Sequence, residues 1–357
     1  MKTSDFDYFL PPEQIAQTPI EPRDASRLLI LNRANGQIEH RHFRDIGEFL
    51  RPGDVLVFNQ TRVIPTRLYG RKIPSGGKVE LLLLRREADQ TWRGLVGGHN
   101  VKEGARLRFE AGDASIEGTV ISSGDEAERV IRFDAPLRPL LDRLGDTPLP
   151  PYIHERLSDP ERYQTVYARE EGSAAAPTAG LHFTPELLVA LRERGIRLAY
   201  CTLHIGLDTF LPVREEDLDE HKMHTERAIL RAEDAKIVNE AKLAGGRIVA
   251  VGTTAVRTLE TAALKSAGID DPYSGAGDDA CPWRPVIAID SSTNLFIRPG
   301  YHFRAVDALI TNFHLPRSTL LALVSAFAGR EMILDTYRIA QQAGYRFYSF
   351  GDAMLIL

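Results

Sequence analysis

The spacing of hydrophobic and polar residues changes twice along the chain and divides it into three parts. In the first part, residues 27–31 and 55–59 are short and almost continuously apolar, which is typical of strands buried on both faces of a sheet. Residues 43–50 have the spacing of a short amphipathic helix. The N-terminal part is therefore predicted to place two buried strands in a larger sheet.

The second part, from about residue 62 to residue 146, consists of short strand candidates that alternate with turns. Glycine-containing turns lie at 75–77, 97–98 and 123–125, and the strand candidates are 78–84, 91–96, 106–109, 115–121 and 129–133. Short strands at regular intervals with glycine turns between them predict a small antiparallel barrel or sandwich.

In the third part, after a stiff proline-rich linker at 148–152, apolar runs alternate with helical patterns. Thr184 suits the N-cap of a helix because Pro185 follows it at the first helical position. The expected strands are 198–204, 247–251, 294–297 and 308–311, and the expected helices are 185–194, 232–244, 253–266 and 317–329. This alternation favours a largely parallel sheet.

Together the three parts predict two domains, which a chain of 357 residues can accommodate. The α/β main domain, a largely parallel sheet with flanking helices, is expected to be discontinuous and to comprise residues 1–61 and 149–357. An antiparallel β-barrel domain is expected to be inserted at 62–148.

Charged residues are distributed unevenly along the chain. The net charge of −5 gives no sign of nucleic-acid binding over the whole chain. Residues 62–108, however, contain eleven basic residues and only four acidic ones. The basic residues are Arg62, Arg67, Arg71, Lys72, Lys78, Arg85, Arg86, Arg93, Lys102, Arg106 and Arg108. The predicted barrel domain therefore carries a basic surface.

Cysteine usage and hydropathy exclude several classes of protein. Only Cys201 and Cys281 are present, so the chain has neither a disulfide framework nor a cysteine-rich zinc site. The N-terminus has no apolar signal segment, and no run of about 18 apolar residues suggests a membrane span. We expect a cytoplasmic protein that makes no membrane contact.

Polar residues follow several of the predicted strands, at the edge of the sheet where parallel α/β folds bind ligands. After the strand at 247–251, a helix N-terminus with Thr253, Thr254 and Arg257 suits a carboxylate or phosphate. After the strand at 308–311, Asn312 and His314 are expected to face the space above the sheet. The small residues of 175–180 suit a backbone that passes close to a ligand.

Histidines gather at the ends of predicted elements, namely His182, His204, His221, His224 and His314. A single histidine is often only a structural hydrogen-bonding group, but five in such positions favour a site. One alternative is a metal-dependent hydrolase that uses His182, His204, His221 and His224. No His-Glu-x-x-His motif and no acidic cluster completes such a site, so no metal is expected. Another alternative is a non-catalytic RNA-binding module.

Long motifs also occur in order along the whole chain, at 51–54, 59–65, 148–152, 163–168, 175–184, 202–204, 221–224, 251–254, 296–301, 311–316 and 351–355. In these motifs the chain resembles the S-adenosylmethionine:tRNA ribosyltransferase-isomerases of queuosine biosynthesis. The resemblance implies an α/β domain with an inserted β-barrel. It also implies a transferase that moves and isomerises the ribosyl group of S-adenosylmethionine onto 7-aminomethyl-7-deazaguanine at the tRNA wobble position.

The resemblance implies epoxyqueuosine-tRNA, adenine and methionine as products. S-adenosylmethionine is then the co-substrate, without a metal, and the partners are the tRNAs for Asp, Asn, His and Tyr, bound by a monomer. Removal of a proton next to the sulfonium would start the reaction, so a base of near-neutral pKa is needed.

Within the resemblance, His204 and His182 are expected to be the proton-transferring pair, followed by His314 and His224. Tyr167 or Phe183 is expected to lie over the sulfonium. The donor site would be completed by Thr253, Thr254, Arg257 and Asn312, and the candidates for contacts to tRNA phosphates are Arg62, Arg67, Arg71, Lys72, Arg85 and Arg86.

Overall fold

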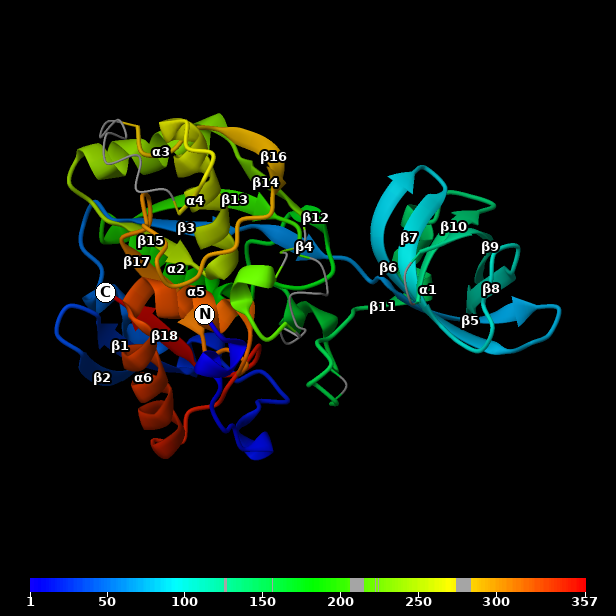
Figure 1. Ribbon diagram of the computed structural model, residues 1–357, viewed down its shortest axis with the longest axis horizontal. Coiled ribbons are helices and arrows are strands. Elements are labelled where there is room, and N and C mark those ends of the chain that lie inside the picture. The colour runs from blue at the N-terminus through cyan, green and yellow to red at the C-terminus, as the bar shows by residue number, and fades with distance from the viewer. Residues whose placement is uncertain (125–126, 156, 206–214, 222, 224, 274–283) are drawn as a thin grey trace. The chain divides into compact units, whose positions relative to one another are not determined.

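A computed structural model describes residues 1–124, 127–155, 157–205, 215–221, 223, 225–273 and 284–357 (Figure 1). The chain forms two compact units. The first unit comprises Met1–Thr61, Pro151–Glu170 and Ala176–Leu357, and the second comprises Arg62–Pro150 and Glu171–Ala175. The insertion expected at 62–148 lies within the second unit.

In the described part of the first unit, nine strands form one mixed sheet in the order β16-β14-β13-β3-β15-β17-β18-β1-β2. Its central strands β13, β3, β15 and β17 run parallel, whereas antiparallel pairs flank them. The strands are β1 (Arg27–Asn32), β2 (Gln37–His42), β3 (Val55–Asn59), β13 (Arg197–Leu203), β14 (Glu226–Leu230), β15 (Ile248–Val251), β16 (Ile289–Thr293), β17 (Ala308–Asn312) and β18 (Ala353–Ile356). The predicted α/β class is confirmed, with the parallel pairing concentrated at the centre.

Helices cover both faces of this sheet because its strands are apolar on both sides. Val55 and Val57 of β3 join a core with the helices α3 (Ala232–Leu243), α4 (Thr253–Ala267), α5 (Thr319–Ala328) and α6 (Arg330–Gln342). Leu56 and Phe58 point the opposite way and pack against α2 (Pro185–Glu193) and a 3₁₀ segment, Phe43–Glu48. This alternation follows the two-residue period of a strand.

Two predicted elements differ from the structure. Residues 43–50 form a 3₁₀ segment rather than an α-helix. Residues 294–297 are not a strand, because the carbonyl of Leu295 accepts from Arg257 and that of Phe296 from Tyr273, so side chains replace a neighbouring strand as partners.

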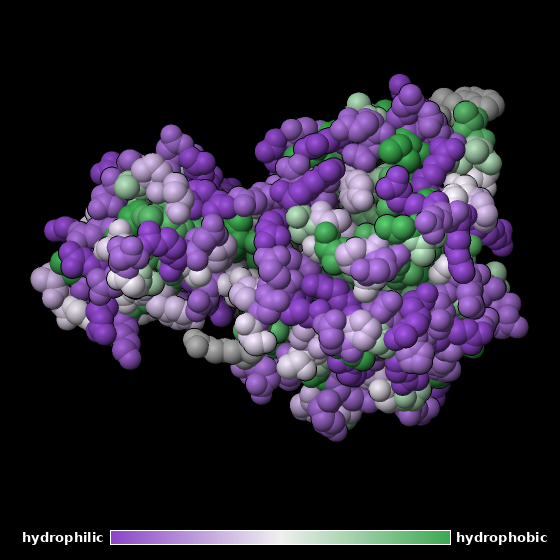
Figure 2. Space-filling view, turned by 180° about the vertical axis from the view of Figure 1, so that it is seen from behind, coloured by the Kyte–Doolittle hydropathy of each residue, from purple (hydrophilic) through white to green (hydrophobic). Residues whose placement is uncertain are grey.

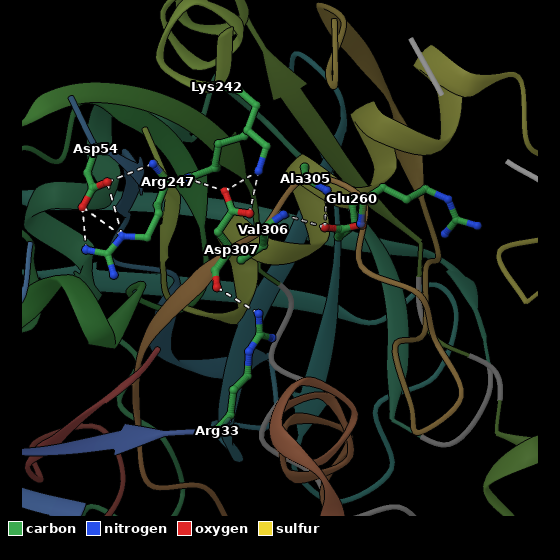
Figure 3. Close-up of polar contacts among 10 residues, drawn as sticks. Arg33, Asp54, Lys242, Arg247, Glu260, Ala305, Val306 and Asp307 are labelled. Atoms are coloured by element: carbon green, nitrogen blue, oxygen red, sulfur yellow. Dashed lines mark hydrogen bonds and ion pairs between the residues drawn. The ribbon is translucent and has the colours of Figure 1, made fainter. Parts of the chain in front are cut away.

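Partly buried ion pairs hold together the amino ends of three of the central strands, β3, β15 and β17 (Figure 3). Asp54, just before β3, accepts from the backbone amide of Arg247 at 2.8 Å and from its Nη2 at 2.7 Å. Asp307, just before β17, accepts from Lys242 Nζ at 2.6 Å and from the amide of Ile248 at 2.8 Å. These contacts fix the register of the three strands at their amino ends, which lie at the edge of the sheet opposite the carboxyl ends.

Replacing Asp54 with alanine is expected to lower the free energy of unfolding by about 3–5 kcal/mol, because a partly buried guanidinium and two backbone amides lose their acceptor. The matched control is Asp290→Ala. Its ion pair with Arg227 is more than half exposed, so we expect a loss of under about 1 kcal/mol. Urea denaturation of both variants measures the difference, and equal losses would contradict this assignment.

The second unit contains a closed antiparallel barrel, with strands paired as β5-β6-β7-β10-β9-β8 and closure between β8 and β5 in the described residues. Its strands are β5 (Arg67–Ile73), β6 (Lys78–Ala88), β7 (Thr91–Gly97), β8 (Arg106–Ala111), β9 (Ala114–Ser123) and β10 (Glu128–Phe133). Gly70 permits the closure, since a Cβ there would lie 2.4 Å from the carbonyl oxygen of Arg108. The predicted barrel is confirmed.

The remaining elements are short, namely β4 (Thr61–Val63), β11 (Gly145–Asp146), β12 (Glu170–Ser173) and α1 (Leu141–Leu144). On the face drawn in Figure 2, hydrophilic residues cover most of the surface and hydrophobic residues appear in scattered patches. None of the helices in the described ranges has the length and apolar character needed to cross a bilayer.

Candidate active site

A pocket lies at the carboxyl ends of the parallel strands of the first unit. The segments that follow β13, β15 and β17 meet there, because neighbouring parallel strands end at the same edge of a sheet. The pocket encloses about 670 Å³ of space, including solvent at its mouth. Its lining residues are Tyr152, Ala176, Pro177, Thr178, Ala179, Ile205, Gly252, Thr253, Thr254, Thr311, Asn312, Phe313, His314, Leu315, Ser318, Leu320, Tyr348 and Ser349.

His314 lies in the wall of this pocket with a hydroxyl beside each ring nitrogen. Its Nδ1 is 3.2 Å from the hydroxyl of Tyr337, and its Nε2 is 3.1 Å from Oγ1 of Thr311. The hydroxyl of Tyr8 donates to its carbonyl oxygen. Burial lowers the pKa of His314 to about 3, so the ring is neutral at pH 7.

Asn312 reaches the pocket from the end of β17, and His182 holds it from behind. Asn312 Nδ2 donates to the carbonyl of Tyr348 and to His182 Nε2, both at 3.1 Å. An amide nitrogen can only donate, so the proton of the neutral ring lies on Nδ1, which is 2.7 Å from Ser26 Oγ. Burial, and then the charges of nearby arginines, lower the pKa of His182 to about 3. His182 is thus neutral and has both nitrogens occupied.

His204 follows β13 directly and precedes the pocket residue Ile205. Its Nδ1 is 3.0 Å from Thr61 Oγ1, and the single proton of that hydroxyl goes to the carbonyl of Glu170. Thr61 therefore accepts the Nδ1 proton, which leaves the lone pair on Nε2. Burial, assisted by the charge of Arg227, lowers the pKa of His204 below its ordinary value of 6.5.

The N-terminus of α4 forms a second polar wall of the pocket. Its N-cap residue, Gly252, has a φ of +87° and no side chain to cap the helix. Within the described residues, the Oγ1 of Thr254 is buried and has no hydrogen-bond partner. Free amide groups, a hydroxyl and the positive end of the helix dipole suit an anionic group. Arg257 instead forms a buried ion pair with Glu226.

The aromatic side chains around the pocket differ from those that the sequence suggested. Tyr167 and Phe183 both pack on Phe58 in the core, with ring centroids 4.7 and 5.0 Å away. Tyr152 and Tyr348 line the pocket, and their centroids are 4.7 Å apart. Tyr348 has a φ of +69°, which is unfavourable for a bulky residue and is typical of functional sites.

Sequence reasoning missed Tyr152, Tyr348 and Ser349 as pocket residues. The sequence pattern places Tyr152 in a stiff linker and predicts no role for the aromatic-rich stretch at 345–350. The unusual density of aromatic residues before the last strand was the available signal. By contrast, the small residues of 176–179 do line the pocket, as their size suggested.

The histidines of the alternative metal site have separate partners. His221 Nδ1 lies 2.9 Å from Glu215, while His182 and His204 bind hydroxyl groups. His224 lies outside the described residues. In the part of the chain that the structure describes, no three or more His, Cys, Asp or Glu side chains are grouped to hold a metal ion. The metal-dependent hydrolase therefore has no support.

The fold and the pocket define the class: an α/β protein with a pocket at the carboxyl ends of its central strands, and with an inserted antiparallel barrel. A family described as queuosine biosynthesis protein matches residues 3–356. The chain belongs to this family.

Two curated relatives match over the full length of both chains. They are S-adenosylmethionine:tRNA ribosyltransferase-isomerases from Moorella thermoacetica, 56% identical, and from Symbiobacterium thermophilum, 55% identical. A crystal structure of S-adenosylmethionine tRNA ribosyltransferase from Thermotoga maritima is 39% identical and gives a TM-score of 0.54, with 99% of this chain and 100% of that chain covered.

Proposed function

We propose that this protein is an S-adenosylmethionine:tRNA ribosyltransferase-isomerase. It transfers and isomerises the ribosyl group of S-adenosylmethionine onto 7-aminomethyl-7-deazaguanine at the wobble position of tRNA, giving epoxyqueuosine-tRNA, adenine and methionine. The observation that carries the proposal is the identity of more than half of all positions, over the full length, with two relatives of that name. Nucleoside mass spectrometry of the reacted tRNA tests it, and a wobble base that is still 7-aminomethyl-7-deazaguanine after complete incubation would contradict it.

The pocket residues fit the donor. We place the methionine carboxylate at the N-terminus of α4, where the hydroxyl of Thr254 has no hydrogen-bond partner among the described residues and Thr253 lies beside it. The sulfonium and the adenine have aromatic neighbours in Tyr152 and Tyr348, which take the role that Tyr167 and Phe183 had in the sequence-based hypothesis. Arg257 contributes indirectly, by fixing α4 against Glu226.

We assign the base to His204 Nε2. The sulfonium makes the C5′ hydrogens of the donor ribose acidic, and removal of one of them begins the loss of adenine. Among the predicted histidines that the structure describes, both nitrogens of His182 and of His314 have partners, whereas His204 Nε2 has none. The lowered pKa keeps its lone pair available at neutral pH. His182 then positions Asn312 through their hydrogen bond, and His314 contributes a neutral polar ring to the pocket wall.

The partners follow from the same activity. The acceptors are the tRNAs for Asp, Asn, His and Tyr, and the enzyme acts as a monomer in the cytoplasm.

S-adenosylmethionine is consumed as the ribosyl donor, and no metal takes part, so activity is expected to survive exhaustive chelation. Loss of activity after chelation, with recovery on addition of zinc, would contradict this.

Replacing Thr254 with valine is expected to raise the KM for S-adenosylmethionine about tenfold or more with a smaller change in kcat, because a hydrogen bond to a charged group contributes about 1.5–3 kcal/mol. The control is Thr258→Val, one turn further along α4, where the hydroxyl donates to the carbonyl of Thr254 and does not line the pocket. Steady-state kinetics with varied donor distinguish the two, and an unchanged KM in the Thr254 variant would remove the carboxylate from this position.

A further inference from the structure

The basic surface of the barrel is mostly neutralised by its own carboxylates. Arg93 pairs with Glu87 and Glu128, and Arg106 and Arg108 pair with Glu117. Nearby, Arg85 pairs with Glu87 and Arg86 with Asp89. The eleven basic residues counted between 62 and 108 are therefore not equally available to an anionic partner.

Among the described residues, no carboxylate pairs with Lys72, Lys102, Arg71 or Lys78. Arg71 and Lys78 differ from the other two because they are cross-strand neighbours. They lie directly opposite each other on β5 and β6, and Arg108 lies opposite Arg71 on the other side, on β8. Three cations thus form one row across three strands, although like charges in cross-strand pairs are unfavourable. Within the described residues, Arg71 has only the carbonyl of Gly76 as a hydrogen-bond partner, at 3.3 Å, and Lys78 has none. Glu117 compensates Arg108 alone in this row.

This row lies in a groove of about 1130 Å³, including solvent at its mouth, and the groove is also lined by Tyr69, Lys72 and Glu110. Tyr69 is two residues before Arg71, so both side chains are on the same outer face of β5, about 7 Å apart along the strand. Its side chain is 52% exposed, which is high for a large aromatic residue. An exposed aromatic ring beside uncompensated cations is typical of surfaces that bind unpaired nucleotides.

We propose that this groove binds the tRNA substrate at an unpaired nucleotide, with a base stacked on Tyr69 and the adjoining phosphates bound by Arg71 and Lys78. Base stacking uses the aromatic face, and phosphate binding compensates two neighbouring charges that have no carboxylate partner among the described residues. The inference rests on the proposed function, which makes tRNA the substrate. Of the phosphate contacts expected from the sequence, it keeps Arg71 and excludes Arg85 and Arg86, and it adds Lys78.

The test compares two double variants that each remove two positive charges from exposed positions of the barrel. In Arg71→Ala/Lys78→Ala, we expect tRNA affinity to fall about tenfold or more at physiological salt, and the slope of log affinity against log salt to become shallower by up to about 2. In Arg85→Ala/Arg86→Ala, we expect affinity within about twofold of the unaltered protein, because those charges are already paired. Fluorescence anisotropy of labelled tRNA measures both.

Stacking has its own pair of variants. Tyr69→Ala is expected to weaken tRNA binding about tenfold, and Tyr69→Phe, which keeps the aromatic face, is expected to bind nearly normally. Circular dichroism verifies that each variant is folded. Normal binding by Arg71→Ala/Lys78→Ala or by Tyr69→Ala overturns the groove proposal, as does an equal loss in Arg85→Ala/Arg86→Ala.

Adenine release by the unaltered protein separates this proposal from the proposed function. If the unaltered protein releases adenine while Arg71→Ala/Lys78→Ala binds tRNA normally, only the groove proposal fails. If the unaltered protein never releases adenine, the proposed function fails, whatever the anisotropy shows.

Discussion

Replacing His204 with alanine is expected to lower the rate of adenine release by about 10²–10⁴-fold, which is the usual contribution of a general base. The structure gives His204 an Nδ1 proton held by Thr61 and an Nε2 without a partner in the described residues. In the unaltered enzyme, kcat/KM should rise with pH through an apparent pKa below 6.5, because burial favours the neutral ring. Steady-state kinetics with modified tRNA measure both quantities.

Two controls accompany this variant. His302→Ala removes an exposed histidine of the same unit, and its rate should stay near normal. Thr61→Val keeps the imidazole but removes the acceptor of its Nδ1 proton, so the apparent pKa in the pH profile should move while His204 still acts. Near-normal turnover by His204→Ala would exclude His204 from proton transfer.

The two fully buried histidines predict a large loss of stability in mild acid. Their pKa values are about 3 in the folded protein, against an ordinary value of 6.5. A depressed folded pKa means that the unfolded chain binds more protons, so stability is complete above pH 6.5 and is lost as the pH falls toward 3. Between pH 7 and pH 5, each ring is expected to cost about 2 kcal/mol, or about 4 kcal/mol for His182 and His314 together. Urea denaturation at the two pH values measures the loss.

His204 and His40, whose pKa values burial also lowers, add to this loss in the same direction. Although burial opposes its ionisation, hydrogen bonds from Arg247 and from two backbone amides lower the pKa of Asp54, so it stays ionised throughout this range. Burial raises the pKa of Glu260, which works in the opposite direction. In His314→Asn, the difference in unfolding free energy between pH 7 and pH 5 should be smaller by about 2 kcal/mol, the contribution of that ring. A difference that is the same with and without the ring would contradict the assignment.

The sequence was sufficient for the fold class because the pattern of buried residues there is strong. The strands at 27–31 and 55–59 are apolar on both faces in the sequence and are covered on both faces in the structure. The polar edge strand β2 was missed, since only one of its residues, Ile38, contacts the core. The helix α6 was missed because Gly329 suggests a helix end, whereas here a φ of +90° lets one helix follow another directly.

Site residues could be predicted where they directly follow a strand. They could not be predicted where the orientation of the side chain decides whether it enters the pocket. Asn312, His314, Thr253 and Thr254 follow β17 and β15, and all of them line the pocket. Arg257 belongs to the same helix as Thr254, but one turn places it against Glu226 instead. Which histidine keeps a free nitrogen depends on the hydroxyls of Ser26, Thr61, Thr311 and Tyr337, and no pattern in the sequence connects these distant positions.

Incubation of the purified protein with S-adenosylmethionine and tRNA that carries 7-aminomethyl-7-deazaguanine, followed by chromatography of free bases, tests the central claim most directly. One adenine should appear for each tRNA nucleoside converted, and neither product should form when the tRNA carries an ordinary guanine. Conversion of the tRNA without adenine, or no adenine with both substrates present, would contradict the account.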